Sequence, residues 1–213
     1  MPAARTSARP FALAAILVVA SAHGAPVAAG NLVRNGSFDA QPNPLAFWTN
    51  ASEALATWAS DGASGSQGSV QLRFLPPGRA DQAILGAVYF TGLTQCVSLP
   101  GAGPYALAGY ARVAATASPS SIAGIRWVLR TNGPACIGAV TQSGSVGFPR
   151  STAWTASFPS LIQFEASEWT VGTTLEIQLQ AGDSSTQTVE ALEAFIDAVT
   201  LEEQPFFGDG FEG

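Results

Sequence analysis

Two pairs of carboxylates, each pair three residues apart, come closest to a catalytic pattern in this sequence. They are Glu165 with Glu168 in "FEASEW" and Glu190 with Glu193 in "EALE". Glycosidases hold two carboxyl groups roughly 5–5.5 Å or 6.5–9.5 Å apart across the scissile bond. Residues three apart on a strand face opposite sides, so neither pair would converge without a turn. We therefore expect no enzyme, and a two-carboxylate glycosidase is the weakest function that we consider.

The residues behind most other enzyme chemistry are missing. His23 is the only histidine, and the chain contains no lysine. His23 falls at the cleavage region of the signal peptide predicted below. Without histidine or lysine, the mature chain has no Ser-His-Asp triad, no Cys-His pair and no Schiff base, and a histidine-ligated zinc or copper site is excluded as well. Cys96 and Cys136 are the only cysteines. An even count in an exported chain favours one disulfide over two free thiols, with a stabilisation of roughly 3–4 kcal/mol.

The first residues have the pattern of a secretory signal peptide. Arg5 and Arg9 precede an apolar run over 11–20, and Ala20-Ser21-Ala22 offers a cleavage site, with an alternative cut after Gly24. The run is too short to span a bilayer, so we expect a secreted or periplasmic protein without a transmembrane anchor, of bacterial type. The predicted organisation is a signal peptide over 1–22, a linker over 23–30, one domain over 31–202 and an acidic, aromatic tail over 203–213.

Charge argues against nucleic acid as a partner. Once the signal peptide is removed, seven arginines face fifteen acidic residues, a net charge near −8. Nucleic acids are bound by clustered cations that displace counterions.

Hydrophobic residues alternate with polar ones along most of the chain after residue 30, which is typical of strands with one buried face. The clearest segments are "SVQLRF" (69–74), "YALAGYARV" (105–113), "IRWVLR" (125–130) and "TLEIQLQ" (174–180). Gly- and Pro-rich turns separate them. Eight to ten such strands without an internal repeat predict an all-β fold, a single antiparallel β-sandwich.

The outward side chains of three of these strands are polar and capable of hydrogen bonding, as sugar recognition requires. They are Tyr110, Arg112, Arg126, Arg130, Glu176, Gln178 and Gln180. If the three strands are neighbours, these side chains would line a groove for a polysaccharide or cell-surface glycan. The alternative is an ordinary solvated sheet face.

Tryptophan supplies a large apolar face and one N–H donor for sugar rings. Trp48, Trp154 and Trp169 lie near strand ends and are candidates for that role, with simple packing as the alternative. Trp127 shares a face with buried residues and is expected in the core. Trp58, in "ALATWAS", is expected there too.

Four segments, in order, resemble the carbohydrate-binding modules of families 4 and 9. "NLVRNGSFD" (31–39) is similar to their first strand, "ASGSQGSVQLRF" (63–74) to a turn and strand, "QCVSLPGAGPYALAGYARV" (95–113) to paired strands, and "FIDAVTL" (195–201) to their last strand. The resemblance implies a galactose-binding-like jelly roll, a sugar groove on one sheet face and a structural calcium ion.

Asp197 and Asp39 are the calcium ligands that the resemblance implies. In the alternating pattern of "FIDAVTL", Asp197 shares the face of Phe195, Val199 and Leu201. A carboxylate pointing toward a core is costly unless it is paired or bound to a metal, and calcium needs few carboxylates beside carbonyl oxygens. Alternatively, Asp197 bonds backbone amides or pairs with Arg34. Gly36 is expected to form a bulge or a close backbone approach in the first strand.

Three functions remain to be compared. The first is a secreted, non-catalytic protein resembling a carbohydrate-binding module, and the second is an extracellular structural or adhesive sandwich without sugar binding. The third is the glycosidase considered above.

Overall fold

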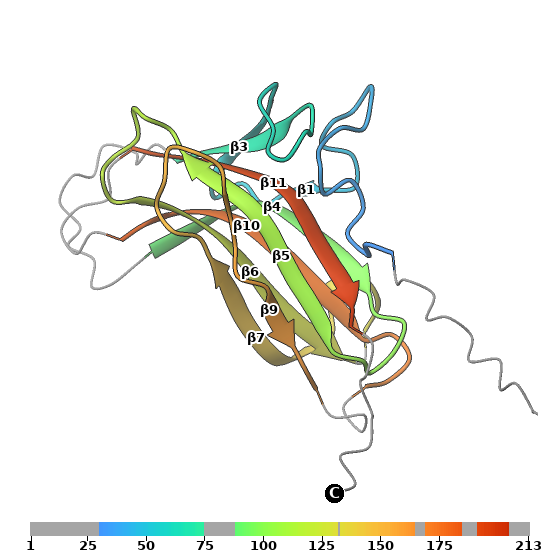
Figure 1. Cartoon of the computed structure of the whole chain (residues 1–213). Helices are drawn as coiled ribbons and strands as arrows, with labels where there is room; N and C mark the ends of the chain where they lie inside the picture. The colour runs from blue at the N-terminus through green and yellow to red at the C-terminus, as the bar shows by residue number, and fades with distance from the viewer. Residues whose placement is uncertain (1–29, 75–87, 132, 165–168, 185–190, 205–213) are drawn as a thin grey trace, which may run out of the picture.

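The computed structural model describes residues 30–74, 88–131, 133–164, 169–184 and 191–204, and these residues form two antiparallel sheets packed face to face (Figure 1). Sheet A has the order β1 (Thr49–Asn50), β4 (Val88–Ser98), β10 (Thr174–Asp183), β6 (Ser121–Thr131) and β7 (Ala139–Gly147). Sheet B has the order β2 (Leu55–Ala59), β3 (Ser69–Phe74), β11 (Leu192–Glu203), β5 (Tyr105–Val113) and β8 (Thr155–Ala156), and β9 (Ser160–Ile162) also pairs with β5. The predicted all-β jelly-roll sandwich is confirmed.

The core lies between the two sheets and is filled by the residues whose alternation predicts it. On β10, Leu175, Ile177 and Leu179 are fully buried against sheet B. On β6, Ile125 and Leu129 lie directly opposite Leu179 and Leu175 in the register and are buried with them. In Figure 1, β11 and β5 run side by side in front of β10 and β6, so the inward faces of these four strands meet.

The opening segment 31–39 is not a strand, which corrects the sequence-based prediction. Asn35 and Phe38 have positive φ angles, and the chain turns there. The Asn35 amide donates to the carbonyl of Pro44 and accepts from the backbone N–H of Ala40, which fixes the following loop. Local side-chain hydrogen bonds of this kind replace a strand ladder.

The predicted close backbone approach at Gly36 is confirmed. Its carbonyl accepts from the N–H of Val199 at 3.0 Å, and a Cβ at Gly36 would lie 2.0 Å from the Val199 carbonyl oxygen. Only glycine fits at such a contact. Asn31 adds two hydrogen bonds to the same end of β11, one to the Val199 carbonyl and one from the Leu201 N–H.

The two strands expected to pair within residues 95–113 lie in different sheets. β4 belongs to sheet A and β5 to sheet B, so the Gly- and Pro-rich segment 99–104 carries the chain across the sandwich rather than around a hairpin. Tyr105 is the first residue of β5. Its hydroxyl donates to the Gly101 carbonyl at 2.7 Å, which fixes this crossover.

The predicted disulfide between Cys96 and Cys136 is present. It connects β4 to η1 (Pro134–Cys136), a short 3₁₀ turn in the loop between β6 and β7. Since the bond closes a loop of 40 residues, we expect the double substitution Cys96→Ser, Cys136→Ser to lower the free energy of unfolding by about 4 kcal/mol. Urea unfolding with and without reductant checks this: reductant should destabilise the wild type and leave the variant unchanged.

The predicted signal peptide, the acidic tail beyond residue 204, and Glu165, Glu168 and Glu190 lie outside the described residues. No helix in the described part of the chain is long and apolar enough to cross a membrane.

Candidate functional site

Five of the seven polar candidates come together on the outer face of sheet A, the side that points away from sheet B. β6 and β10 are hydrogen-bonded neighbours, with Arg126 opposite Gln178 in the register. The five residues on this face are Arg126, Arg130, Glu176, Gln178 and Gln180. The sequence predicted that these side chains would lie together if their strands are neighbours. For β6 and β10 this condition is met.

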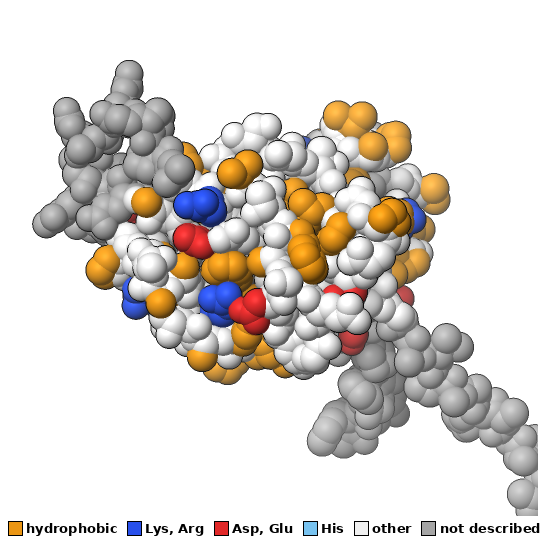
Figure 2. All heavy atoms as spheres, turned by 90° about the horizontal axis from the view of Figure 1, so that it is seen from above, with side chains coloured by type: hydrophobic (Ala, Val, Ile, Leu, Met, Phe, Trp, Pro, Cys, Tyr) orange, Lys and Arg blue, Asp and Glu red, His pale blue; other side chains and the backbone are white. Residues whose placement is uncertain are grey.

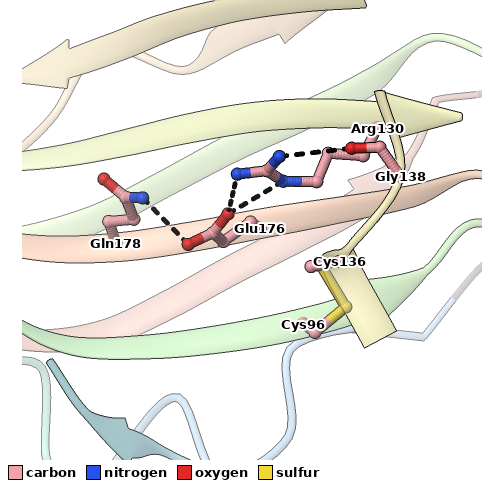
Figure 3. Close-up of a disulfide and its surroundings, with 6 residues drawn as sticks. All are labelled: Cys96, Arg130, Cys136, Gly138, Glu176 and Gln178. Atoms are coloured by element: carbon pink, nitrogen blue, oxygen red, sulfur yellow. Dashed lines mark hydrogen bonds and ion pairs between the residues drawn. A yellow bond between two sulfur atoms is a disulfide. The ribbon is translucent and has the colours of Figure 1, made fainter. Parts of the chain in front are cut away.

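Most of the charge on this face is already paired within the protein (Figure 3). Arg130 donates from Nε and a terminal nitrogen to one carboxylate oxygen of Glu176, at 3.0 and 2.8 Å. Its other terminal nitrogen reaches the Gly138 carbonyl at 3.3 Å, and Gln178 donates to the second Glu176 oxygen at 2.9 Å. The result is a fixed, nearly neutral row of donors and acceptors, with Arg126 exposed beside it.

The disulfide bounds this face at one end. Cys96 lies opposite Glu176 in the register between β4 and β10, so it is on the same side of sheet A. Figure 3 shows η1 held over this end of the sheet by the Cys96–Cys136 bond, near the Arg130–Glu176 pair. The loop between β6 and β7 therefore stands beside the polar row and is tied in place covalently.

An aromatic platform, Tyr89, lies at the other end and was missed by the sequence analysis. Its ring covers two glycines on neighbouring strands: a Cβ at Gly182 would lie 2.7 Å from the ring, and one at Gly124 2.9 Å. Tyr89 is 39% exposed, so part of the side chain remains open to solvent. Like any phenol, the Tyr89 hydroxyl is a neutral donor at neutral pH, and burial raises its pKa further.

A signal for Tyr89 does exist in the sequence. Glycine within a strand often marks the close approach of another group, and both Gly124 and Gly182 lie in otherwise well-patterned strands. What cannot be seen is that β4 brings a tyrosine across both of them, because that depends on the order of strands in sheet A.

Tyr110 and Arg112 do not belong to this surface, which corrects the single seven-residue groove. They lie on β5, in sheet B, and face the opposite side of the molecule. Arg112 is engaged there: its guanidinium pairs with Asp61 at 2.6 Å and lies 3.8 Å from the ring centre of Phe195 and 5.3 Å from that of Trp154. An arginine held in this way stabilises the outer side of sheet B.

The structure places some tryptophans in the core and others at the surface, and this division differs from the sequence-based prediction. Trp127 is in the core, as predicted. Trp48 is in the core as well: it is 9% exposed, packs against Phe38 and donates to the Asn35 carbonyl, so it is no sugar platform. Trp58 was expected in the core but lies on the edge strand β2, 38% exposed, with its N–H on the Phe38 carbonyl.

Trp154 and Trp169, the other two platform candidates, are half-buried. Their indole N–H groups are shielded from solvent and have no hydrogen-bond partner among the described residues. Neither lies on the polar strands of the outer face of sheet A.

Asp197 faces away from the core, contrary to the alternating pattern. β11 has a bulge between Asp197 and Thr200, and Ala198 adopts a φ of +46°. The extra residue shifts the alternation by one, so Ile196 and Val199 both point inward and are fully buried, whereas Asp197 lies opposite Tyr110 on the outer side of sheet B. The loop 61–68 covers it, and Asp197 is 0% exposed.

The buried Asp197 carboxylate accepts hydrogen bonds from this loop and from its own strand. Oδ2 accepts from the Ala63 N–H at 2.6 Å and the Ser66 hydroxyl at 2.7 Å, and Oδ1 accepts from the Ala198 N–H at 2.6 Å. The backbone-amide alternative is therefore confirmed. The Arg34 alternative is wrong, because that guanidinium lies 3.7 Å from the centre of the Phe47 ring.

The oxygen atoms around Ser66 fit a calcium ion. Ser66 Oγ lies 2.7 Å from Asp197 Oδ2, 2.6 Å from the Gly68 carbonyl and 3.3 Å from the Ser37 carbonyl. A hydroxyl carries one hydrogen, so it can donate to only one of these three acceptors. Such a surplus of oxygen acceptors suits a hard cation that takes carbonyl, hydroxyl and carboxylate ligands.

Asp39 supplies a second carboxylate beside this cluster. Its Oδ1 accepts from the Gln67 N–H in the same loop at 2.8 Å, and its charge contributes to raising the pKa of Asp197. Among the described residues, no three His, Cys, Asp or Glu side chains are grouped so that they could hold a metal ion. The other ligands of a calcium ion here would be backbone and hydroxyl oxygens.

The Asp197 carboxyl makes stability depend on pH. Burial raises its pKa, against the opposing effect of the hydrogen bonds from Ser66, Ala63 and Ala198. Without calcium the folded chain then holds this proton to higher pH than the unfolded chain. The free energy of unfolding should fall as pH rises from about 4, the unfolded value, through the raised folded value.

Calcium should oppose this fall, because it binds the ionised carboxylate. Melting curves in calcium-free buffer and with calcium, at several pH values, check both effects. In Asp197→Asn, the part of the pH dependence of the free energy of unfolding that comes from the Asp197 carboxyl should disappear. An unchanged slope would contradict its assignment to Asp197.

No protein-family model matches this sequence, and no curated protein does either. Solved structures similar to the chain are carbohydrate-binding modules. The CBM22-1 xylan-binding domain of Paenibacillus barcinonensis Xyn10C has 15% identity and a TM-score of 0.48, covering 83% of this chain and 96% of that one. A structure described as "CBM4 structure and function" has 14% identity and a TM-score of 0.43, covering 80% and 99%.

A third similar structure is the C-terminal family 22 module of Clostridium thermocellum Xyn10B, at 12% identity and a TM-score of 0.44, covering 80% of this chain and 95% of that one. These are modules of the kind that the sequence motifs resemble. With TM-scores below 0.5, the likenesses carry no argument about the ligand.

Proposed function

We propose that this chain is an exported, non-catalytic protein that binds a neutral polysaccharide along the outer face of sheet A. The observation that carries the proposal is the partly exposed Tyr89 ring, which packs against Gly124 and Gly182 on the outer face of sheet A. Aromatic rings placed flat on a surface suit the apolar C–H faces of sugar rings, and a phenol adds one hydrogen-bonding group.

Apart from the exposed Arg126, the charges of this face are paired, which supports an extended, uncharged ligand. From Glu176 to Gly182 the strand runs for about 20 Å, long enough for several sugar units. Arg130 and Glu176 neutralise each other, and Gln178 holds the carboxylate in place, so hydroxyl groups meet a preorganised row. Gln180 is buried and bonds Thr91 across the strands, so its role is to support the face rather than to contact a ligand.

The face of the molecule shown in Figure 2 carries few charged side chains, and some of its basic groups lie beside acidic ones. The sequence has a net charge of −6. Neither property favours an anionic polymer as ligand.

A structural calcium ion is part of the proposal. Asp197, Asp39, Ser66 and the carbonyls of Gly68 and Ser37 would hold it, and it would join loop 61–68 to the bulge in the middle of β11. This joint lies on the side of sheet B, so the ion would stabilise the fold without touching a ligand on sheet A.

Affinity electrophoresis against a panel of soluble polysaccharides tests the proposal: xylan, mixed-linkage and β-1,3-glucans, galactomannan and, as an anionic control, polygalacturonate. We expect retardation by at least one neutral polymer and none by polygalacturonate. No retardation by any neutral polymer would favour a structural or adhesive sandwich. N-terminal sequencing of the protein from the medium or periplasm tests the export step and the cleavage site.

A further inference from the structure

A hollow lies on the outer face of sheet B, on the side of the molecule opposite to the proposed polysaccharide face of sheet A. It has a volume of about 480 Å³, within the range of small-molecule sites. β5, β11 and β8 form one side of it, and loop 61–68 with the turn that carries Asp39 forms the other. Because Gln178 and Tyr89 are on sheet A, no residue of the proposed polysaccharide face lines this hollow.

Small side chains on adjacent strands leave this space open. Ala108 and Gly109 on β5, Ala198 on β11 and Ala156 on β8 all line it. Gly109 is itself packed from below, since a Cβ there would lie 3.1 Å from the Ile125 side chain. The bulge in β11 that turns Asp197 outward also brings Ala198 and Thr200 to the hollow.

The lining combines one aromatic ring with oxygen groups. Tyr110 is half-buried at the wall, and Asp39 contributes a half-exposed carboxylate whose Oδ1 accepts from Gln67. Ser157 and Thr200 add hydroxyl groups. No arginine, lysine or histidine is among the described lining residues, so the side chains of the hollow offer an anionic ligand no partner for its charge. Ser37, Asp39 and Ser66, which line the hollow, also belong to the proposed calcium cluster.

We propose that this hollow binds a single neutral sugar unit, as a free saccharide or as the end of a glycan chain. The ring would lie against Tyr110, and its hydroxyls would donate to Asp39 and exchange hydrogen bonds with Ser157 and Thr200. This site is independent of the polysaccharide face on sheet A. With both sites occupied, the protein would join two glycan chains from opposite sides.

Filling the hollow tests this directly. Ala156 is exposed on the short edge strand β8 and is not among the hydrogen-bond partners of Asp197 or Ser66, so Ala156→Phe should occupy the space and leave those hydrogen bonds in place. Ala153→Phe is the matched control, an exposed alanine three residues earlier that does not line the hollow. Tyr110→Leu is a second variant that removes the ring without filling the space.

The probes are the methyl glycosides of glucose, galactose, mannose and xylose, measured by saturation-transfer difference NMR with calcium present. All variants are made in a Tyr89→Ala background, so that binding to sheet A contributes little to the signal. We expect one glycoside to bind this background and its Ala153→Phe derivative, and to bind the Ala156→Phe and Tyr110→Leu derivatives at least about tenfold more weakly.

No signal from any glycoside in the Tyr89→Ala background would overturn the second site, as would a signal that neither Ala156→Phe nor Tyr110→Leu reduces. Melting curves with and without calcium show whether each variant is folded. Because polysaccharide retardation by the wild type is measured separately, failure of this site is distinguishable from failure of the sheet A proposal.

Discussion

Tyr89→Ala is expected to weaken polysaccharide binding by about thirtyfold, which corresponds to about 2 kcal/mol. The substitution removes the one large aromatic ring that covers the outer face of sheet A, and uncovers the backbone at Gly124 and Gly182. The effect on folding should be small, because the ring is 39% exposed and lies outside the core between the sheets. Isothermal titration with the polymer that retards the wild type measures the change.

Two controls separate stacking from loss of any aromatic surface. Tyr89→Phe keeps the ring and removes the hydroxyl, so we expect it to retain most of the affinity. Phe158→Ala removes a ring that is 91% exposed, beyond the end of β8 and away from sheet A, and should leave affinity unchanged. Equal losses in Tyr89→Ala and Phe158→Ala would contradict the assignment of the site to sheet A.

Asp197→Ala is expected to lower the free energy of unfolding by about 3–5 kcal/mol and to abolish stabilisation by calcium. It leaves the N–H groups of Ala63 and Ala198 without their acceptor in a buried position, and each unsatisfied buried donor costs about 1–3 kcal/mol. The Ser66 hydroxyl can still donate to the Gly68 carbonyl. Thermal melting with calcium, and after its removal by a chelator, measures both effects.

Asp39→Asn is the matched variant that tests calcium binding separately from the stability of the calcium-free fold. Asp39 is half-exposed, and an asparagine oxygen can still accept from the Gln67 N–H, so stability without calcium should change little. Loss of the negative charge of Asp39 should nevertheless weaken calcium binding. If calcium stabilises the wild type and Asp39→Asn equally, Asp39 is not a ligand; if it does not stabilise the wild type at all, no calcium site exists here.

The fold was largely predictable because the alternation of apolar and polar residues within a single strand shows which of its faces is buried. Ile125 with Leu129, and Leu175 with Ile177, show the alternation that assigns both strands to the core. The disulfide was predictable for a simpler reason, since Cys96 and Cys136 have no other partner in the sequence.

The site was only partly predictable, because it depends on which strands are neighbours. β6 and β10 are adjacent and bring Arg126 and Gln178 together, whereas β5, equally polar on its outer side, belongs to the other sheet. No local pattern distinguishes these two cases. Sheet order is set by long-range pairing, for which alternation carries no signal.

Backbone irregularities account for the remaining errors. The bulge at Ala198 shifts the alternation of β11, and positive φ angles at Asn35 and Phe38 turn a segment with a strand-like pattern into a folded loop. In each case the irregularity is stabilised by contacts with distant residues, such as Ala63 on Asp197 and Pro44 on Asn35. These contacts are invisible at the level of a single segment.

Chemical-shift mapping by NMR is the most direct measurement of the central claim. Oligosaccharides of the polymer that retards the protein would be titrated into ¹⁵N-labelled chain, and shifts of backbone amides recorded. We predict the largest shifts at Gly124, Gln178 and Gly182, and their loss in Tyr89→Ala. Saturating shifts that avoid all three residues, or shifts unaffected by Tyr89→Ala, would contradict a polysaccharide site on the outer face of sheet A.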